Sequence, residues 1–155
     1  MSRRSIVKKR CPLTDSKYNS FLVHLLIARV LKKGKKQLSN SLVLETLAIV
    51  KEKTNKDPLY LFEKAIKKVT PRVEVKGKRI GGSTYQVPLE VSRYCGTILA
   101  LRWLIKASRT RSVRTTSLKL ASEIIDASKG IGNAVRKREE THRIAKANKA
   151  FAHFK

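Results

Sequence analysis

Lysine and arginine side chains carry most of the chemistry that this sequence offers. There are 36 of them against 11 acidic residues, which gives a net charge of +25 in a chain of 155 residues. Ammonium and guanidinium groups bind phosphate oxygens, so this excess indicates a strongly anionic partner. Nucleic acid is favoured over an anionic membrane surface, and no apolar run of the sequence is long enough to cross a bilayer.

Groups suited to catalysis or to metal binding are few and scattered. The cysteines, Cys11 and Cys95, match no zinc-ligand spacing, and His24, His142 and His153 belong to no Ser/His/Asp set. The stretch GKRIGGST lacks the Gly-Lys-Ser/Thr end of a phosphate loop and opens a strand rather than a helix. The sequence therefore predicts a protein that is not an enzyme and that needs no cofactor and no metal.

The stretch KGKRIGGSTYQVPLEV, residues 76–91, alternates apolar and polar residues as a β-strand does and contains a Gly-Gly turn. We expect residues 72–91 to form a hairpin arm that protrudes toward an external partner, with nothing in the protein behind its tip. A hairpin folded flat on the body is the alternative. Three cations lie on its first strand, and we call them the arm cations: Lys76, Lys78 and Arg79.

The turn of this hairpin raises a question of register. A strict two-residue turn at Gly81 and Gly82 would pair odd with even positions, whereas the apolar residues of both strands are odd-numbered. A shift of one residue moves every side chain to the other face of the ribbon. We therefore expect a three-residue loop or a bulge near the glycines.

Helical periodicity covers most of the remaining sequence and predicts a mainly α fold: one domain, 1–155, built as a six-helix bundle with a protruding two-stranded antiparallel β-hairpin arm. The fourth helix has the broadest apolar face, with Tyr94 on a core stripe, and we expect it to be the most buried. The sixth belongs to a polar C-terminal helix and tail, 132–155, supported by the pairs Arg136–Glu140 and Glu139–Arg143. The expected helices span about 20–34, 36–53, 58–70, 92–109, 115–129 and 133–149.

The cations outside the hairpin fall into three groups. Residues 1–18 form either a solvated tail or, as we favour, a basic arm that orders on a phosphate backbone. Four lysines surround the expected end of the first helix, where part of the charge could simply complement the helix dipole. Arg102, Lys106 and Arg109 occupy the polar face of the fourth helix and lead into the basic segment SRTRSVR.

Several long phrases carry a resemblance to a known family. They are VKGKRIGGSTYQVPLEV, ALRWLIKASRTR and DASKGIGNAVRKREETHRIAKANKAFAHF, together with an early GKK. In these phrases, over almost its whole length, the chain resembles small-subunit ribosomal protein seven of the bacterial type. The resemblance implies binding to the 3′ major domain of small-subunit rRNA, nucleation of head assembly, and a place beside the exit-site tRNA and the mRNA path. It also implies contact with small-subunit ribosomal protein eleven. We expect no membrane partner and no homo-oligomer.

Carried over by position, the resemblance assigns site residues of two kinds. Those expected to contact rRNA are Arg3, Arg4, Lys8, Lys9, Arg10, Lys32, Lys33, Lys35, Lys36, Arg72, Lys76, Lys78, Arg79, Arg102, Lys106, Arg109, Arg111 and Arg114. Those expected to face tRNA and mRNA, at the hairpin tip and on the sixth helix, are Gly81, Gly82, Ser83, Thr84, Tyr85, Arg136, Lys137 and Arg143.

The lysine-rich composition and the length are most similar to the plastid-encoded form of this family. We therefore expect a ribosome in the plastid (chloroplast) stroma, with the bacterial cytoplasm as second choice. Two other classes remain open from the residues alone: an architectural DNA-binding protein with a basic two-stranded arm, and a protein-only scaffold, for which the charge of +25 has no use.

Overall fold

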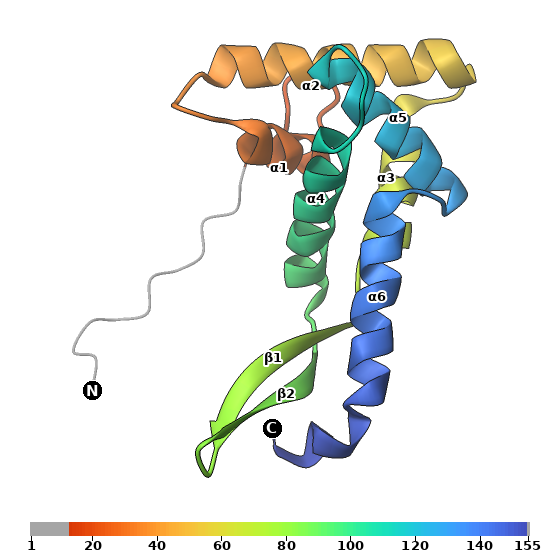
Figure 1. The fold of residues 1–155 in the computed structure, drawn as a ribbon. Coiled ribbons are helices and arrows are strands. Elements are labelled where there is room, and N and C mark those ends of the chain that lie inside the picture. Colours follow the sequence, from red (N-terminus) through yellow and green to blue (C-terminus); the bar gives the residue numbers. More distant parts are fainter. Residues whose placement is uncertain (1–12, 155) are drawn as a thin grey trace, which may run out of the picture.

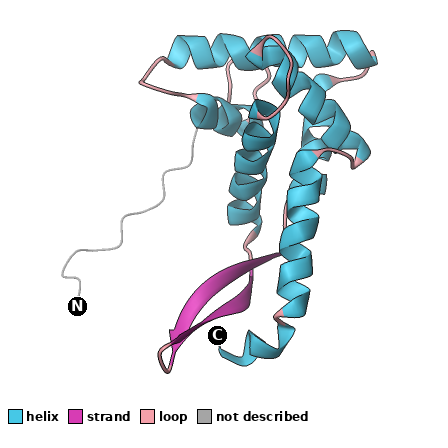
Figure 2. Ribbon diagram, viewed as in Figure 1, coloured by secondary structure: helices cyan, strands magenta, loops and turns pink. Residues whose placement is uncertain are grey.

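A computed structural model describes residues 13–154, and within them it contains six α-helices, a two-stranded antiparallel sheet and a short C-terminal 3-10 helix. This architecture confirms the predicted fold class (Figures 1 and 2). In chain order the elements are α1 (Phe21–Val30), α2 (Lys36–Thr54), α3 (Pro58–Val69), β1 (Val73–Ile80), β2 (Ser83–Glu90), α4 (Arg93–Arg109), α5 (Thr116–Lys129), α6 (Asn133–Ala147) and η1 (Lys149–Phe154).

The first turns of three helices are fixed by local chemistry. Asp57 accepts hydrogen bonds from the backbone N–H groups of Leu59 and Tyr60, and Pro58 follows it as the first helical residue. Ser92 and Thr115 act in the same way at the starts of α4 and α5. The predicted starts of α3, α4 and α5 are thereby confirmed.

The first helix is shorter than predicted. It ends at Val30, and Leu31 leaves the helix with ψ 126°. Beyond Val30 the sequence offers one apolar residue, Leu31, which is 37% exposed, so burial does not hold a further turn in place. Lys33 and Gly34 then adopt positive φ (52° and 72°) and reverse the chain into α2, so Gly34 lies in the connecting loop rather than capping α1.

The core is formed by α1 to α5 with a contribution from the start of α6. Its fully buried large side chains include Leu26, Leu47, Phe62, Leu104 and Ile124. In Figure 1, α2 lies across one end of the molecule, and α4 and α6 run from there toward the hairpin at the opposite end.

The prediction of a core stripe beginning at Tyr94 is wrong for the first turn of α4. Tyr94 is 44% exposed, and Cys95 is exposed too. This turn extends past the core toward the hairpin and is anchored instead by Gly96. A Cβ atom on that glycine would lie 2.9 Å from Thr70 Cγ2 and 3.2 Å from the Pro71 carbonyl oxygen, so only glycine fits there.

The hairpin register differs from the predicted one. Val73 pairs with Glu90 and Ile80 with Ser83, which leaves the two-residue turn Gly81-Gly82 at φ 55° and 91°. Two positive φ values in a two-residue loop match the right-handed twist of the strands, and this turn geometry sets the register. The mixed faces are tolerated because both are covered at the base of the arm: the consecutive residues Val87 and Pro88 point to opposite faces, and both are buried.

The arm protrudes from the bundle, yet it is braced from one side. Strand β1 packs on α6 and β2 packs on η1 (Figure 1). The rings of Tyr85 and Phe151 lie 5.1 Å apart between centroids, tilted by 44°. The expectation that Tyr85 has nothing in the protein to lean on is therefore wrong, because the chain returns through η1 to support it.

The polar helix α6 is attached through a narrow apolar face and through polar bonds to neighbouring elements. Ala134, Val135 and Ala145 are buried. The guanidinium of Arg138 donates to the carbonyl of Lys68, and the imidazole of His142 accepts from a backbone N–H at the start of the hairpin. The predicted intrahelical pairs at spacing four are not formed; Lys137 instead bonds Glu140 at 2.8 Å, and Arg138 bonds Glu139 at 3.4 Å.

Candidate nucleic-acid interface

The arm cations extend from both faces of the hairpin. Lys76 and Lys78 lie opposite Val87 and Tyr85, on one face, and Arg79 points to the other because side chains alternate along a strand. All three are exposed, as are the tip residues 81–84. The hairpin therefore presents positive charge and a small-residue tip to whatever lies beyond the body.

A second basic surface consists of the loop between α1 and α2 and the first residue of α2. We call it the lysine corner: Lys32, Lys33, Lys35 and Lys36, all exposed. Because α1 ends at Val30, the last two of these lysines stand at the N-terminus of α2. The dipole of α2 disfavours positive charge at this end. Helix stabilisation thus does not explain Lys35 and Lys36, and all four lysines are exposed to solvent.

A third basic surface lies between α4 and α6. Arg102 and Lys106 of α4 and Lys137 of α6 line one groove with a volume of about 390 Å³. The structure thereby brings together two residues predicted to contact rRNA and one predicted to face tRNA or mRNA. Arg109, at the C-terminal end of α4, is exposed as well, and Arg114 is exposed in the loop that follows.

Arg111 is the exception among the predicted RNA-binding arginines that the structure describes, because its guanidinium points into the protein. Nε donates to Glu123 Oε2 at 2.6 Å and Nη2 donates to Asp126 Oδ2 at 2.5 Å. The other oxygen of Glu123 accepts the backbone N–H of Ala134 at 3.0 Å. The cluster therefore ties the α4–α5 loop and the start of α6 to α5.

The electrostatics of this cluster follow from its burial. The Glu123 side chain is 0% exposed and that of Asp126 is 37% exposed. Burial by itself lowers the pKa of Arg111, but the hydrogen bonds and charges of Asp126 and Glu123 outweigh it, so that pKa is raised. Sequence reasoning missed this cluster. The available signal was a pair of acids three residues apart, beside the apolar stripe of α5, in a chain with few acids.

The outer face of α6 carries mixed charge. Arg136, Lys137 and Arg143 are exposed there, and Glu139 and Glu140 stand between them. The hydrogen bond and charge of Lys137 lower the pKa of Glu140. This surface, predicted to face tRNA and mRNA, is less cationic than the hairpin or the lysine corner.

His142 connects α6 to the base of the hairpin. Its Nε2 atom accepts the backbone N–H of Arg72 at 3.2 Å, which requires a neutral imidazole. Burial, followed by the charges of Arg138, Arg72 and Lys146, lowers the pKa of His142. The Arg72 side chain itself is exposed, as its predicted contact with rRNA requires.

The remaining predicted cations, Arg3, Arg4, Lys8, Lys9 and Arg10, lie outside the described residues. Of the predicted arm 1–18, residues 13–18 are described. There the carboxylate of Asp15, 6% exposed, accepts the N–H groups of Lys17 and Tyr18, both at 3.2 Å. Tyr18 packs against the core.

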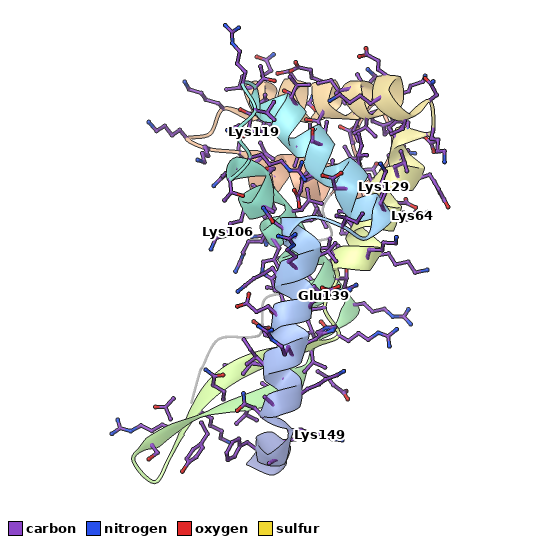
Figure 3. All side chains as sticks on the ribbon, turned by 45° about the vertical axis from the view of Figure 1, so that its right-hand side comes forward. Lys64, Lys106, Lys119, Lys129, Glu139 and Lys149 are labelled. Carbon is purple, nitrogen blue, oxygen red and sulfur yellow. The ribbon has the colours of Figure 1, made fainter. Side chains whose placement is uncertain are left out.

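The charge is spread around the molecule rather than gathered on one face. In Figure 3, labelled lysines of α3, α4, α5 and η1 extend outward from different sides of the ribbon. Within residues 13–154 there is no group of three His, Cys, Asp or Glu side chains that could hold a metal ion. In the same part of the chain no helix has the length and apolar character that a membrane span requires.

These features define a class of protein: small, strongly basic and mainly helical, with an exposed β-hairpin arm. The chain matches the family Ribosomal protein S7p/S5e over residues 2–149, and it belongs to this family. The resemblance identified from the sequence is thereby confirmed. The chain is a structural constituent of the ribosome and not an enzyme.

Individual relatives agree with this assignment. The chain is 56% identical over 155 residues to small ribosomal subunit protein uS7 of Arthrospira platensis and 58% identical over 155 residues to that of Synechocystis sp.. Each alignment covers 100% of this chain and 99% of the relative. It is also 58% identical over 144 residues to small ribosomal subunit protein uS7c of Trieres chinensis, covering 93% of this chain and 91% of that protein.

Proposed function

We propose that this protein is an RNA clamp of the small ribosomal subunit. It binds the 3′ major domain of the small-subunit rRNA, nucleates assembly of the head, and lines the tRNA exit site near the mRNA path. The observation that carries the proposal is the presence of separate exposed basic surfaces on one helical body: the arm cations, the lysine corner and the α4–α6 groove.

The chemistry of the clamp is electrostatic. Each lysine or arginine that neutralises a phosphate releases condensed counterions, which gives affinity without sequence readout. Specificity arises because structured RNA presents its phosphates in a fixed arrangement, and several basic surfaces must meet separate RNA elements at once. A braced arm and an anchored α6 support this mode of recognition, since they hold the surfaces at fixed distances before binding.

The residues divide between the partners. The arm cations, the lysine corner, Arg72 and the exposed cations of α4 contact rRNA. The tip residues 81–84, with Tyr85 and the α6 cations, face the exit-site tRNA and the mRNA. Arg111 contributes indirectly, by holding the α4–α5 loop and α6 in place. We further propose contact with small-subunit ribosomal protein eleven and location in a plastid ribosome, in line with the lysine-rich composition.

Binding to isolated rRNA domains tests the proposal. The protein is titrated into a 3′ major domain transcript and into a 5′ domain transcript of matched length, with duplex DNA as competitor. We expect a clear preference for the 3′ major domain and hydroxyl-radical protections confined to it. Equal affinity for the two transcripts, or displacement of the RNA by duplex DNA, would refute the proposal and favour an architectural DNA-binding role.

A further inference from the structure

The groove between α4 and α6 contains an aromatic side chain as well as cations. Its lining includes Trp103 and Ala107 of α4, and Asn133 and Lys137 of α6. Trp103 is partly buried and packs against the core, while part of the indole remains on the groove wall. The part of the indole on the groove wall is therefore available to contact an occupant of the groove.

The cations of this groove line it together with Trp103. Arg102 and Lys106 lie on the same helix, one residue before and three residues after Trp103, and neither has an ion-pair partner among residues 13–154. Lys137 lies on the facing helix and is bonded to Glu140 at 2.8 Å. No acidic residue is among the side chains that line the groove in this part of the chain. Charge complementarity therefore points to an anionic occupant.

Two further side chains offer hydrogen bonds to a polar ring edge. The Thr110 hydroxyl donates its proton to the Ala107 carbonyl at 2.8 Å, so its oxygen remains available as an acceptor. The Asn133 amide, exposed at the start of α6, provides both a donor and an acceptor. The groove volume of about 390 Å³ lies within the range of clefts that hold small ligands.

We propose that this groove holds an unstacked base of the bound RNA against Trp103, with the flanking phosphates on Arg102 and Lys106. Base stacking on aromatic side chains, with cations along the backbone, is the usual chemistry of single-stranded RNA recognition. A peptide side chain is a poorer occupant, because it would leave these cations without anions. The inference rests on the proposed function and adds a specific base contact to it.

The fluorescence of Trp103 provides a direct test, because it is the only tryptophan in the chain. The full chain is titrated with a 12-nucleotide single-stranded oligoadenylate and with an abasic oligonucleotide of the same length and backbone. We expect saturable quenching with oligoadenylate and little change with the abasic strand, although both carry the same phosphates. An equal fluorescence response to the two strands would overturn the inference.

Variants separate stacking from charge. Trp103→Leu should weaken binding to the 3′ major domain transcript by about 5- to 150-fold, the range for loss of one stacked base. Trp103→Phe should restore part of that loss, because it keeps an aromatic face. Neither variant should change the slope of log affinity for the transcript against log salt, since the phosphate contacts remain. Circular dichroism establishes that each variant is folded.

Asn133→Ala serves as a second variant, since this residue is exposed and lies outside the core. It should lower affinity for oligoadenylate and leave affinity for the abasic strand unchanged. If the folded variants bind the transcript like the wild type while the wild-type salt slope is steep, the base contact is disproved and the proposed function stands. A shallow wild-type slope would disprove the proposed function itself.

Discussion

Replacing Arg111 with alanine will destabilise the fold rather than only remove an RNA contact. The substitution leaves the Glu123 carboxylate, 0% exposed, with a single backbone N–H from Ala134 as its described partner. Removing one member of a buried ion pair costs about 3–5 kcal/mol, because the other charge stays buried without compensation. This is a large share of the roughly 5–15 kcal/mol that stabilises a typical domain.

Two further variants sharpen the expectation. Glu123→Gln should lower the free energy of unfolding by less, about 1–2 kcal/mol, because the amide oxygen still accepts the N–H of Ala134 and Arg111 keeps its bond to Asp126. Arg111→Lys should recover only part of the loss, since an ammonium lacks the rigid planar set of donors with which the guanidinium reaches both carboxylates from two different nitrogens. The free-energy cost should therefore be largest for Arg111→Ala.

Urea denaturation followed by circular dichroism measures these differences. With a slope of about 2 kcal/mol per molar urea, Arg111→Ala should lower the midpoint by about 2 M. Arg109→Ala is the matched control, because Arg109 is exposed at the end of α4, and it should change stability by less than about 0.5 kcal/mol. The reasoning is refuted if Arg111→Ala leaves stability within about 1 kcal/mol of the wild type yet weakens RNA binding.

Three other perturbations give separate tests. Changing the arm cations together to glutamine should make the slope of log affinity against log salt shallower by about 0.7–0.9 per lost phosphate contact. If the variant instead loses its helical circular dichroism signal, the hairpin belongs to the core. Gly96→Ala should lower the free energy of unfolding, measured by thermal denaturation, by about 1–3 kcal/mol, because the new Cβ would press on the α3–β1 connection. Gly77→Ala is the control: its Cβ would lie 3.5 Å from the nearest atom, so the loss of stability should be far smaller. Since the pKa of His142 is lowered in the folded state, the unfolded chain binds more protons below about pH 6.5, and stability should fall as the pH drops from there toward the native pKa. His142→Gln, which can still accept from Arg72, should flatten that part of the profile; unchanged pH dependence would show that His142 does not titrate there.

The sequence predicted best those features that local chemistry determines. The Asp57-Pro58 start of α3 needs only its own neighbours, and so do the caps at Ser92 and Thr115. Gly130 ends α5 at φ 93° for the same kind of reason. Each of these residues satisfies backbone groups within one turn, so tertiary contacts do not decide the outcome.

Features set by contacts between distant elements were missed. The mixed faces of the hairpin are tolerated because α6 and η1 cover an arm whose tip the sequence suggested was unsupported. Tyr94 has helical core spacing but lies beyond the end of the core. In the sequence Arg111 does not differ from the surface cations around it; only the fold shows that Glu123 and Asp126 lie beside it.

The candidate site was predictable in composition but not in arrangement. Exposure of the lysine corner and the arm cations follows from charge alone, since lysines are rarely buried. The α4–α6 groove is lined by residues of two helices, among them Trp103 and Lys137, and no periodicity in the sequence predicts that these two helices pack side by side.

The salt dependence of binding to the 3′ major domain transcript tests the central claim most directly. If the basic surfaces together meet about six phosphates, the slope of log affinity against log salt should be about −4 to −5, from 0.7–0.9 per contact. A matched unrelated RNA should bind more weakly at every salt concentration. A slope shallower than about −1, or equal affinity for the unrelated RNA, would contradict the claim that this charge clamps folded ribosomal RNA.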